Sequence, residues 1–190
     1  MTLDGLRLYL LAGLVIHKLV WEVLKRRTPS SDRRAPQSAF AVLLKGAKMV
    51  ILVGLVTQTL SPEFVPITNH PLLLRVCGVS LFTFGLCVAI LGRVQLGDSW
   101  ADIEAAQVLQ HQSVVAIGLY RYIRHPIYIG DVVMLLGLEL SLNSWLVLGV
   151  GVLAPYVVWR AVREERMLSA QLPEYDAYRA RTWRFVPFLL

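Results

Sequence analysis

Five long apolar runs, separated by polar or turn-forming stretches, dominate the pattern of the chain. They cover the following residues: 6–24, 40–60, 72–91, 127–140 and 145–162. A helix needs about 20 apolar residues to cross the hydrocarbon of a bilayer, and all of these runs except the fourth come close to that length. The pattern therefore predicts an all-α integral membrane protein with about five transmembrane helices.

Turn and packing residues refine this prediction. Asn143 and Ser144 leave only a very tight link between the last two runs, which predicts an antiparallel helical hairpin. Pro155 lies within the fifth run, where we expect it to break the helix. Gly78 and Gly85 in the third run are suited to close contact with another helix, as small residues are in bilayers.

The distribution of basic residues predicts an orientation in the membrane. The connections 25–34 and 93–124 and the tail 163–190 hold 13 of the 19 Lys and Arg residues, whereas 61–71 holds none. Basic loops stay in the cytoplasm, so we expect the N-terminus outside and a cytoplasmic C-terminus. No cleavable signal is expected, because residues 1–4 lack a basic start and no small-residue cleavage site follows the first run.

Composition supports a membrane protein and narrows the possible partners. The 190 residues are 56% hydrophobic and 17% charged, against about 45–50% and about 25% in soluble domains. The net charge of +6 is compatible with nucleic-acid binding, but the basic residues lie between and after the apolar runs, so we expect no nucleic-acid partner. Cys77 and Cys87 lie in one apolar run and have neither metal-ligand spacing nor a disulfide pattern.

The most informative polar stretch is Gly118-Leu-Tyr-Arg-Tyr-Ile-Arg-His-Pro-Ile-Tyr-Ile-Gly130. Such a cluster is costly beside a bilayer unless it binds something, which makes it a candidate functional site. The residue before a proline avoids the α region, so we expect an extended His125 and a helix that begins at Pro126 or just after. Free N–H groups in the first turn of that helix are suited to an anion or a polar ligand. The alternative is a juxtamembrane loop with Tyr at the headgroups and Arg in the cytoplasm.

The end of the fifth run and the tail bring further polar residues to the same side. Arg160 and Glu164 are four residues apart and therefore share one helix face. As a simple exposed ion pair they would contribute only about 0.5 kcal/mol. Residues 172–187 form an aromatic and basic tail that is able to fold back over a site.

Five sequence pieces occur in a fixed order: Gly-Leu-Tyr120, Arg-His-Pro-x-Tyr-x-Gly130, Glu164-Glu165-x-x-Leu168, Glu174-Tyr-x-x-Tyr178 and Arg184-x-x-Pro187. In this order they resemble the isoprenylcysteine carboxyl methyltransferase family, which is related to the phospholipid methyltransferases. The resemblance runs from about residue 97 onward. We therefore expect helices 1–3 within residues 1–94 and a methyltransferase core within 95–190.

The resemblance implies an integral membrane enzyme that uses S-adenosylmethionine and no metal. The acceptor is expected to be a hydrophobic molecule that enters from the bilayer, beside membrane lipid. Glu164 matches the carboxylate that holds the cofactor, and Arg160 matches the catalytic arginine that orients the acceptor. The other positions that match cofactor-binding residues are Gln112, Val114, Val115, Tyr120, His125, Pro126 and Tyr128.

The chemistry of methyl transfer agrees with this set of residues. The reaction is an in-line displacement whose electrophile the cofactor provides, so the protein chiefly positions the acceptor atom. Arg160 is a suitable clamp for a carboxylate acceptor. His125 is interpreted as a cofactor contact, with a role as base for a thiol or amine acceptor as the alternative. Asp131 and Glu139 are assigned no role.

Two other functions remain open from the sequence. Membrane sterol reductases also resemble this half of the chain, and Gly130-Asp131 is similar to one of their motifs, but they use a dinucleotide and a larger helical bundle. A non-catalytic membrane scaffold would use the motif residues only as headgroup anchors. The acceptor of a methyltransferase also stays open between prenylated cysteine and another lipid or small hydrophobic molecule.

Overall fold

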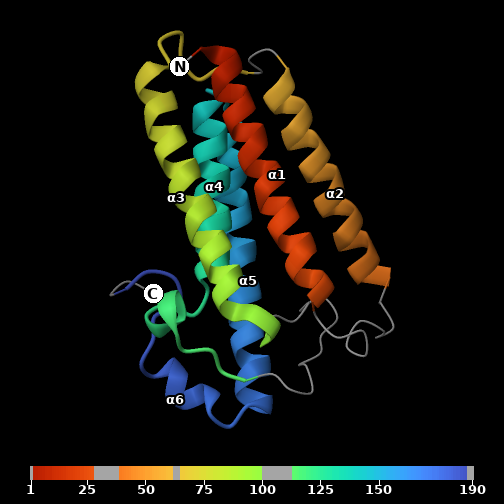
Figure 1. Cartoon of the computed structure of the whole chain (residues 1–190), viewed down its shortest axis with the longest axis vertical. Coiled ribbons are helices and arrows are strands. Elements are labelled where there is room, and N and C mark those ends of the chain that lie inside the picture. Colours follow the sequence, from red (N-terminus) through yellow and green to blue (C-terminus); the bar gives the residue numbers. More distant parts are fainter. Residues whose placement is uncertain (1, 28–38, 62–64, 100–112, 188–190) are drawn as a thin grey trace.

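The computed structural model describes residues 2–27, 39–61, 65–99 and 113–187. These residues form α-helices and two short 3-10 helices, without a strand in the described part of the chain. The elements are α1 (Leu3–Arg27), α2 (Ala39–Leu60), α3 (Leu72–Leu96), η2 (Gly97–Ser99), η4 (Gly118–Arg121), α4 (Pro126–Ser141), α5 (Val147–Gln171) and α6 (Tyr175–Arg179). The five long helices run along the bundle, while η4 and α6 gather at one end (Figure 1). The all-α fold class is confirmed.

Each predicted apolar run corresponds to one of the five long helices, but two details were wrong. We expected a break at Pro155, yet α5 is continuous through it. A proline removes one backbone hydrogen bond and crowds the carbonyl four residues earlier; that residue is Gly151, whose backbone adjusts more easily. Arg93 was placed in a loop, but it lies in the last turn of α3 and is 1% exposed.

Helices α3 and α4 are in backbone contact through glycines. A Cβ atom added at Gly85 would overlap the backbone of Met134, and one added at Gly137 would overlap the backbone of Phe82. The prediction that Gly78 and Gly85 support close packing is therefore confirmed, with α4 as the partner helix. None of the residues of α4 is exposed, which makes it the central helix of the bundle.

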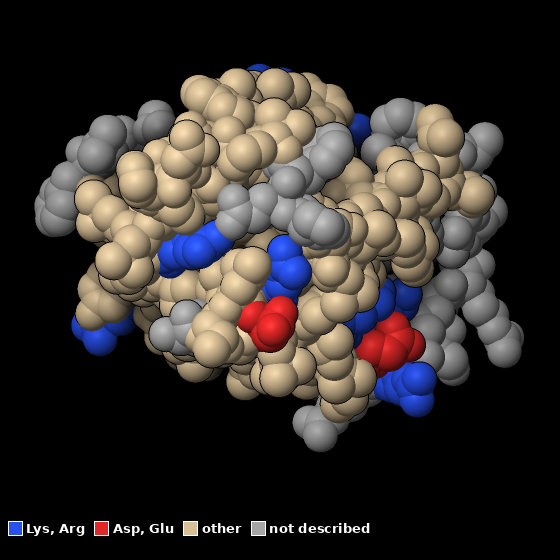
Figure 2. Space-filling model, turned by 90° about the horizontal axis from the view of Figure 1, so that it is seen from above, with Lys and Arg blue, Asp and Glu red and all other residues tan. Residues whose placement is uncertain are grey.

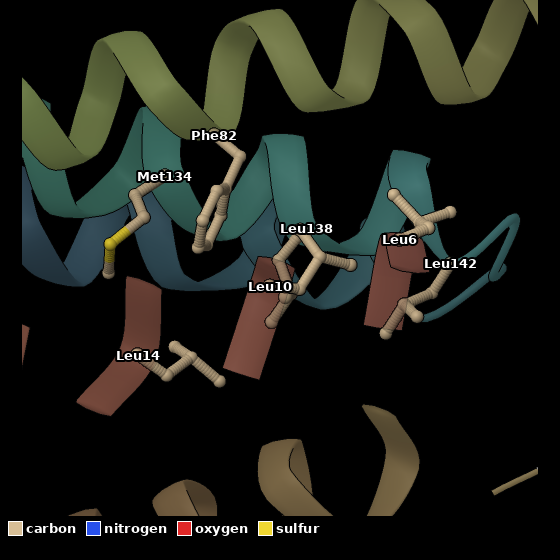
Figure 3. Close-up of a cluster of buried hydrophobic side chains, with 7 residues drawn as sticks. All are labelled: Leu6, Leu10, Leu14, Phe82, Met134, Leu138 and Leu142. Atoms are coloured by element: carbon tan, nitrogen blue, oxygen red, sulfur yellow. The ribbon is translucent and has the colours of Figure 1, made fainter. Parts of the chain in front are cut away.

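A buried apolar cluster joins α1, α3 and α4. Phe82 points from α3 toward leucines of α1 (Figure 3). The members of the cluster are Leu6, Leu10, Leu14, Phe82, Met134, Leu138 and Leu142. Because burial of apolar area is the main favourable term in packing such side chains together, this cluster fixes the position of α1 beside the α3–α4 pair.

The predicted tight link between the last two runs is confirmed, and a loop holds it in place. Asn143 adopts a left-handed backbone with φ 55°, which Asn tolerates better than most residues. Its side-chain oxygen accepts a hydrogen bond from the Thr68 amide at 3.1 Å, and its side-chain amide donates to the Thr68 carbonyl at 2.8 Å. The turn between α4 and α5 is therefore pinned to the connection between α2 and α3.

One described helix, α3, is long and apolar enough to cross a membrane, and the shorter segment Gly46–Leu60 of α2 is also apolar. Large apolar side chains such as Val50 and Val152 are exposed on the outer faces of α2 and α5. Seen from the end that carries the N-terminus, charged side chains are scattered among many uncharged ones (Figure 2). The apolar outer faces of α2 and α5 are suited to contact with lipid rather than water.

The contact between α3 and α4 leads to a stability prediction. We expect Gly137→Ala to lower the free energy of unfolding by about 1–3 kcal/mol, because the new methyl group meets the backbone of Phe82, which cannot turn away. The matched control is Gly149→Ala in α5, where a Cβ atom meets nothing within 4 Å, and which should leave stability unchanged or slightly higher. Chemical unfolding of both variants in one detergent is the measurement; equal effects would contradict the packing argument.

Candidate functional site

A cavity lies where η4, the start of α4, the last turns of α5 and α6 meet, at the lower end of the bundle in Figure 1. Its empty volume is about 740 Å³, part of which is open to solvent. Apolar walls come from Leu96, Ile127, Leu168 and Leu172, and tyrosines and charged groups complete the lining.

The structure brings together most of the residues that the sequence singled out. The predicted residues that line the cavity are Val114, Val115, Tyr120, His125, Tyr128 and Glu164. Pro126 is buried at the start of α4 but is not part of the lining. Arg160 is not part of the lining either; its guanidinium carbon lies 5.9 Å from the centre of the Tyr128 ring. Gln112 lies outside the described residues.

The start of α4 places His125 and Tyr128 side by side. The helix begins at Pro126, as predicted, and His125 precedes it with φ −124° and ψ 56°. This backbone is outside the α region, as expected before proline, although ψ is smaller than in a fully extended residue. The rings of His125 and Tyr128 are nearly parallel, with centroids 5.3 Å apart.

Glu164 presents a carboxylate to the cavity. The Tyr128 hydroxyl donates a hydrogen bond of 2.8 Å to Glu164 Oε2, and His125 Nδ1 lies 3.8 Å from the same oxygen. The side chain of Glu164 is 18% exposed. A carboxylate has several acceptor positions, so Glu164 keeps the capacity to accept hydrogen bonds from a bound molecule.

The neighbouring Glu165 is not part of the cavity lining and is 2% exposed. Its Oε1 accepts a hydrogen bond from Arg124 Nε at 2.8 Å and lies 3.2 Å from His125 Nε2. Arg184 Nε donates to Oε1 at 3.1 Å, and Arg184 Nη2 donates to Oε2 at 2.9 Å. Three segments of the chain therefore meet at one carboxylate.

The charges around Glu165 determine its ionisation. Burial by itself raises the pKa of the Glu165 carboxyl, because it disfavours the charged form. The hydrogen bonds from His125, Arg184 and Arg124 act in the opposite direction and outweigh burial, so the pKa is held well below its usual value. Glu165 therefore stays ionised and binds its cationic partners at neutral pH.

The tail is held against the segment that precedes α4. The Arg124 amide donates to the Trp183 carbonyl at 2.7 Å, the His125 amide to the Arg184 carbonyl at 3.1 Å, and the Trp183 amide to the Tyr122 carbonyl at 2.9 Å. The Arg124 guanidinium also donates to the backbone carbonyls of Arg179, at 3.1 Å, and of Thr182. One basic residue thus connects the tail to the Glu165 cluster.

Two tyrosines close the cavity on the tail side. The Tyr178 hydroxyl donates to the Tyr120 carbonyl at 2.8 Å, and Tyr175 lies beside it in α6 with ring centroids 5.8 Å apart. Burial raises the pKa of Tyr178 to about 12, although the charge of Arg124 lowers it. The phenol therefore stays neutral and remains a hydrogen-bond donor at physiological pH.

No role was predicted from the sequence for Glu165, Arg124 or Arg184, although all three lie in the five ordered motifs. Adjacent residues on a helix point about 100° apart, so one of the two glutamates faces the cavity and the other faces Arg124. Ala161, four residues before Glu165 and so on the same helix face, is the available sequence signal, because a small apolar residue favours a buried face; the structure shows that Ala161 is buried as well. The sequence alone does not tell which of the two glutamates faces the cavity, because this depends on the positions of η4 and the tail.

Comparisons with known proteins show the family of the chain. The phospholipid methyltransferase family profile matches residues 73–174, more than half of the chain, from α3 to the end of α5. The chain is also 31% identical over 113 residues to the cobalt-zinc-cadmium resistance protein CzcN of Cupriavidus metallidurans, a match that covers 58% of this chain and 50% of that protein. The chain thus spans about half the length of this relative. The resemblance inferred from the motifs is confirmed, and the chain belongs to the phospholipid methyltransferase family, which includes the isoprenylcysteine carboxyl methyltransferase-like proteins.

Proposed function

We propose that the protein transfers a methyl group from S-adenosylmethionine to a hydrophobic acceptor at the membrane surface. Membership of a family of membrane methyltransferases supports the reaction class. The observation that carries the assignment to this cavity is the Glu164 carboxylate, which faces the cavity and is oriented by the Tyr128 hydroxyl. The same family membership does not favour the reductase.

The residues around the cavity fit the chemistry of the cofactor. Glu164 would accept hydrogen bonds from the hydroxyl or amine groups of S-adenosylmethionine. The rings of Tyr120 and Tyr128 are suited to a positively charged sulfonium, because aromatic faces attract cations. Val114, Val115 and Leu168 provide apolar walls for the less polar parts. When bound, S-adenosylmethionine supplies a methyl group that is already activated for displacement.

The residues of the chain then have mainly positioning roles. Arg160, next to the Tyr128 ring, would hold the polar end of an acceptor that carries a carboxylate. His125 supports Glu165 through Nε2 and lies near Glu164 through Nδ1, so it orients carboxylates rather than accepting a proton from the acceptor. Tyr175 and Tyr178 exclude water on the tail side.

The proposed arrangement in the membrane has α1 to α5 as five spans, with the N-terminus outside. The cavity then faces the cytoplasm, where the cofactor is available. The acceptor, prenylated cysteine or another lipid, would reach Arg160 from the bilayer. Support comes from the distribution of basic residues along the sequence, because 13 of the 19 Lys and Arg residues lie in the connections 25–34 and 93–124 and in the tail 163–190.

The test is calorimetric titration of the detergent-purified full chain with S-adenosylhomocysteine, with NADPH as the comparison. We expect binding of S-adenosylhomocysteine that weakens at least tenfold, about 1.4 kcal/mol, in Glu164→Gln, because an amide accepts fewer hydrogen bonds and carries no charge. Glu174→Gln, an exposed carboxylate outside the cavity lining, is the matched control and should bind as the wild type. Folded protein that binds only NADPH, or neither compound, would refute the proposal.

A further inference from the structure

An exposed apolar and aromatic surface lies next to the cavity but does not belong to its lining. It consists of Ile117, Tyr122, Trp183 and Val186, which are 64%, 59%, 41% and 41% exposed. We call these four residues the tail patch. Backbone pairing holds its two halves together, because the Trp183 amide donates to the Tyr122 carbonyl at 2.9 Å and Ile123 forms a parallel bridge with Trp183. The tail patch thus joins the segment around η4 to the C-terminal tail.

The position of η4 relates the tail patch to the membrane. The Leu119 amide donates to Gln95 Oε1 at 2.8 Å, so η4 is attached to the last turn of α3. α3 is the described helix that is long and apolar enough to cross a membrane. Its 25 residues span about 37 Å at about 1.5 Å per residue, whereas the hydrocarbon is about 30 Å thick. The turn that contains Gln95 therefore extends into the headgroup region, and η4 with it.

The chemistry of the tail patch suits a lipid surface. Trp and Tyr are enriched at membrane interfaces, because their rings are apolar and carry one polar group. Arg121, which directly precedes Tyr122, and Arg181, two residues before Trp183, are exposed, and the Arg121 guanidinium carbon lies 5.9 Å from the Tyr122 ring centre. These cations complement the negative charge of an anionic leaflet. Leu91 and Val94, on the last turns of α3, are exposed as well.

We propose that the tail patch is a lipid-binding surface that docks on an anionic leaflet and thereby holds the tail against the cavity. The mechanical connection is short, because Trp183 in the tail patch precedes Arg184, which binds the buried Glu165. Contact of Trp183 and Val186 with lipid restrains the segment that places Arg184. The proposal concerns the tail and the membrane, and it holds whether or not the cavity binds S-adenosylmethionine.

The main experiment measures hydrogen exchange of the tail amides in nanodiscs that contain one copy of the full chain. Discs of phosphatidylcholine are compared with discs that also contain phosphatidylglycerol. We expect the amides of residues 183–185 to exchange about fivefold more slowly in the anionic discs for each arginine near the surface. Arg121→Gln should reduce this difference, while Arg166→Gln, an exposed arginine on α5 outside the tail patch, should retain it.

A second measurement locates Trp183 directly. Brominated lipid in the same discs should quench tryptophan emission, and Trp183→Phe should lose part of the quenched emission while it unfolds as the wild type does. Equal exchange of the tail amides in neutral and anionic discs, or Trp183 emission that brominated lipid does not reduce, would overturn the proposal. Slower exchange of the tail amides that is seen only in discs with two copies of the chain would also overturn the proposal, because the tail patch would then be a protein–protein contact.

Discussion

Glu165→Ala should lower the free energy of unfolding by about 3–5 kcal/mol, the range for breaking a buried ion pair by removal of one partner. The substitution removes the carboxylate that binds Arg124, His125 and Arg184. It leaves the Arg124 side chain, which is only 9% exposed, without its charged partner. We expect a larger effect than from any substitution of the neighbouring Glu164, which is more exposed and binds fewer groups.

Chemical unfolding in one detergent compares Glu165→Ala with Glu165→Gln and Glu164→Gln. Glu165→Gln keeps the shape of the side chain and some hydrogen bonds, so it should lie between the wild type and Glu165→Ala. Glu164→Gln should stay close to the wild type. If Glu164→Gln proved as destabilising as Glu165→Ala, the distinction between a cavity carboxylate and a structural carboxylate would be wrong.

The wild type and Glu165→Gln also test how the stability contributed by Glu165 depends on pH. The pKa of Glu165 is lowered in the folded protein relative to its usual value of 4.5, so the unfolded chain takes up a proton at higher pH than the folded chain. The stability that Glu165 contributes is therefore present above pH 4.5 and is lost as the pH falls below it. The difference in unfolding free energy between the wild type and Glu165→Gln should accordingly shrink on acidification.

The second large effect is expected at Arg124. Arg124→Met should lower the free energy of unfolding by about 3 kcal/mol, because it removes a hydrogen bond to Glu165 and bonds to two carbonyls of the tail. The consequence should be local, since the tail loses its contacts with the Arg124 guanidinium but keeps its backbone pairing, Arg184 and the hydrogen bond from Tyr178 to the Tyr120 carbonyl. Limited digestion with trypsin should therefore cut the tail, for example after Arg181, faster than in the wild type.

Two comparisons make the result at Arg124 specific. Arg124→Lys keeps the charge but cannot serve several acceptors with one planar group, so it should lie between wild type and Arg124→Met. Arg163→Met removes an exposed arginine whose guanidinium carbon lies 5.7 Å from the Trp159 ring centre, and its tail should be cut at the wild-type rate. A tail that resists trypsin equally in Arg124→Met would show that the pairing of residues 122–125 suffices to hold it.

Helix positions were predictable because they depend on local features of the chain. The apolar runs located all five long helices, Pro126 marked the start of α4, and Asn143 marked the turn before α5. The end of α5 was predicted only in part. The apolar run ends at Val162, and the helical spacing of Arg160 and Glu164 extends the helix beyond it, but the structure continues α5 to Gln171.

The three tyrosines of residues 118–130 illustrate how far the sequence alone could predict the site. Two interpretations were open, a binding site and a row of headgroup anchors. The structure divides the residues between them, because Tyr120 and Tyr128 line the cavity while Tyr122 is exposed. No spacing rule separates them, since the path of η4 and the pairing of residues 122–125 with the tail set these directions.

The sequence by itself determined the helical membrane class, the order of the helices, the family and six residues of the cavity lining. These follow from composition, short-range periodicity and motifs that are local in the chain. Only the tertiary structure decided that Glu165 is a buried structural centre while Glu164 faces the cavity, and that Arg124 and Arg184 meet there. The physical reason is that these choices depend on contacts between segments 19 to 41 residues apart, whose free energies exist only when the helices and the tail are packed together.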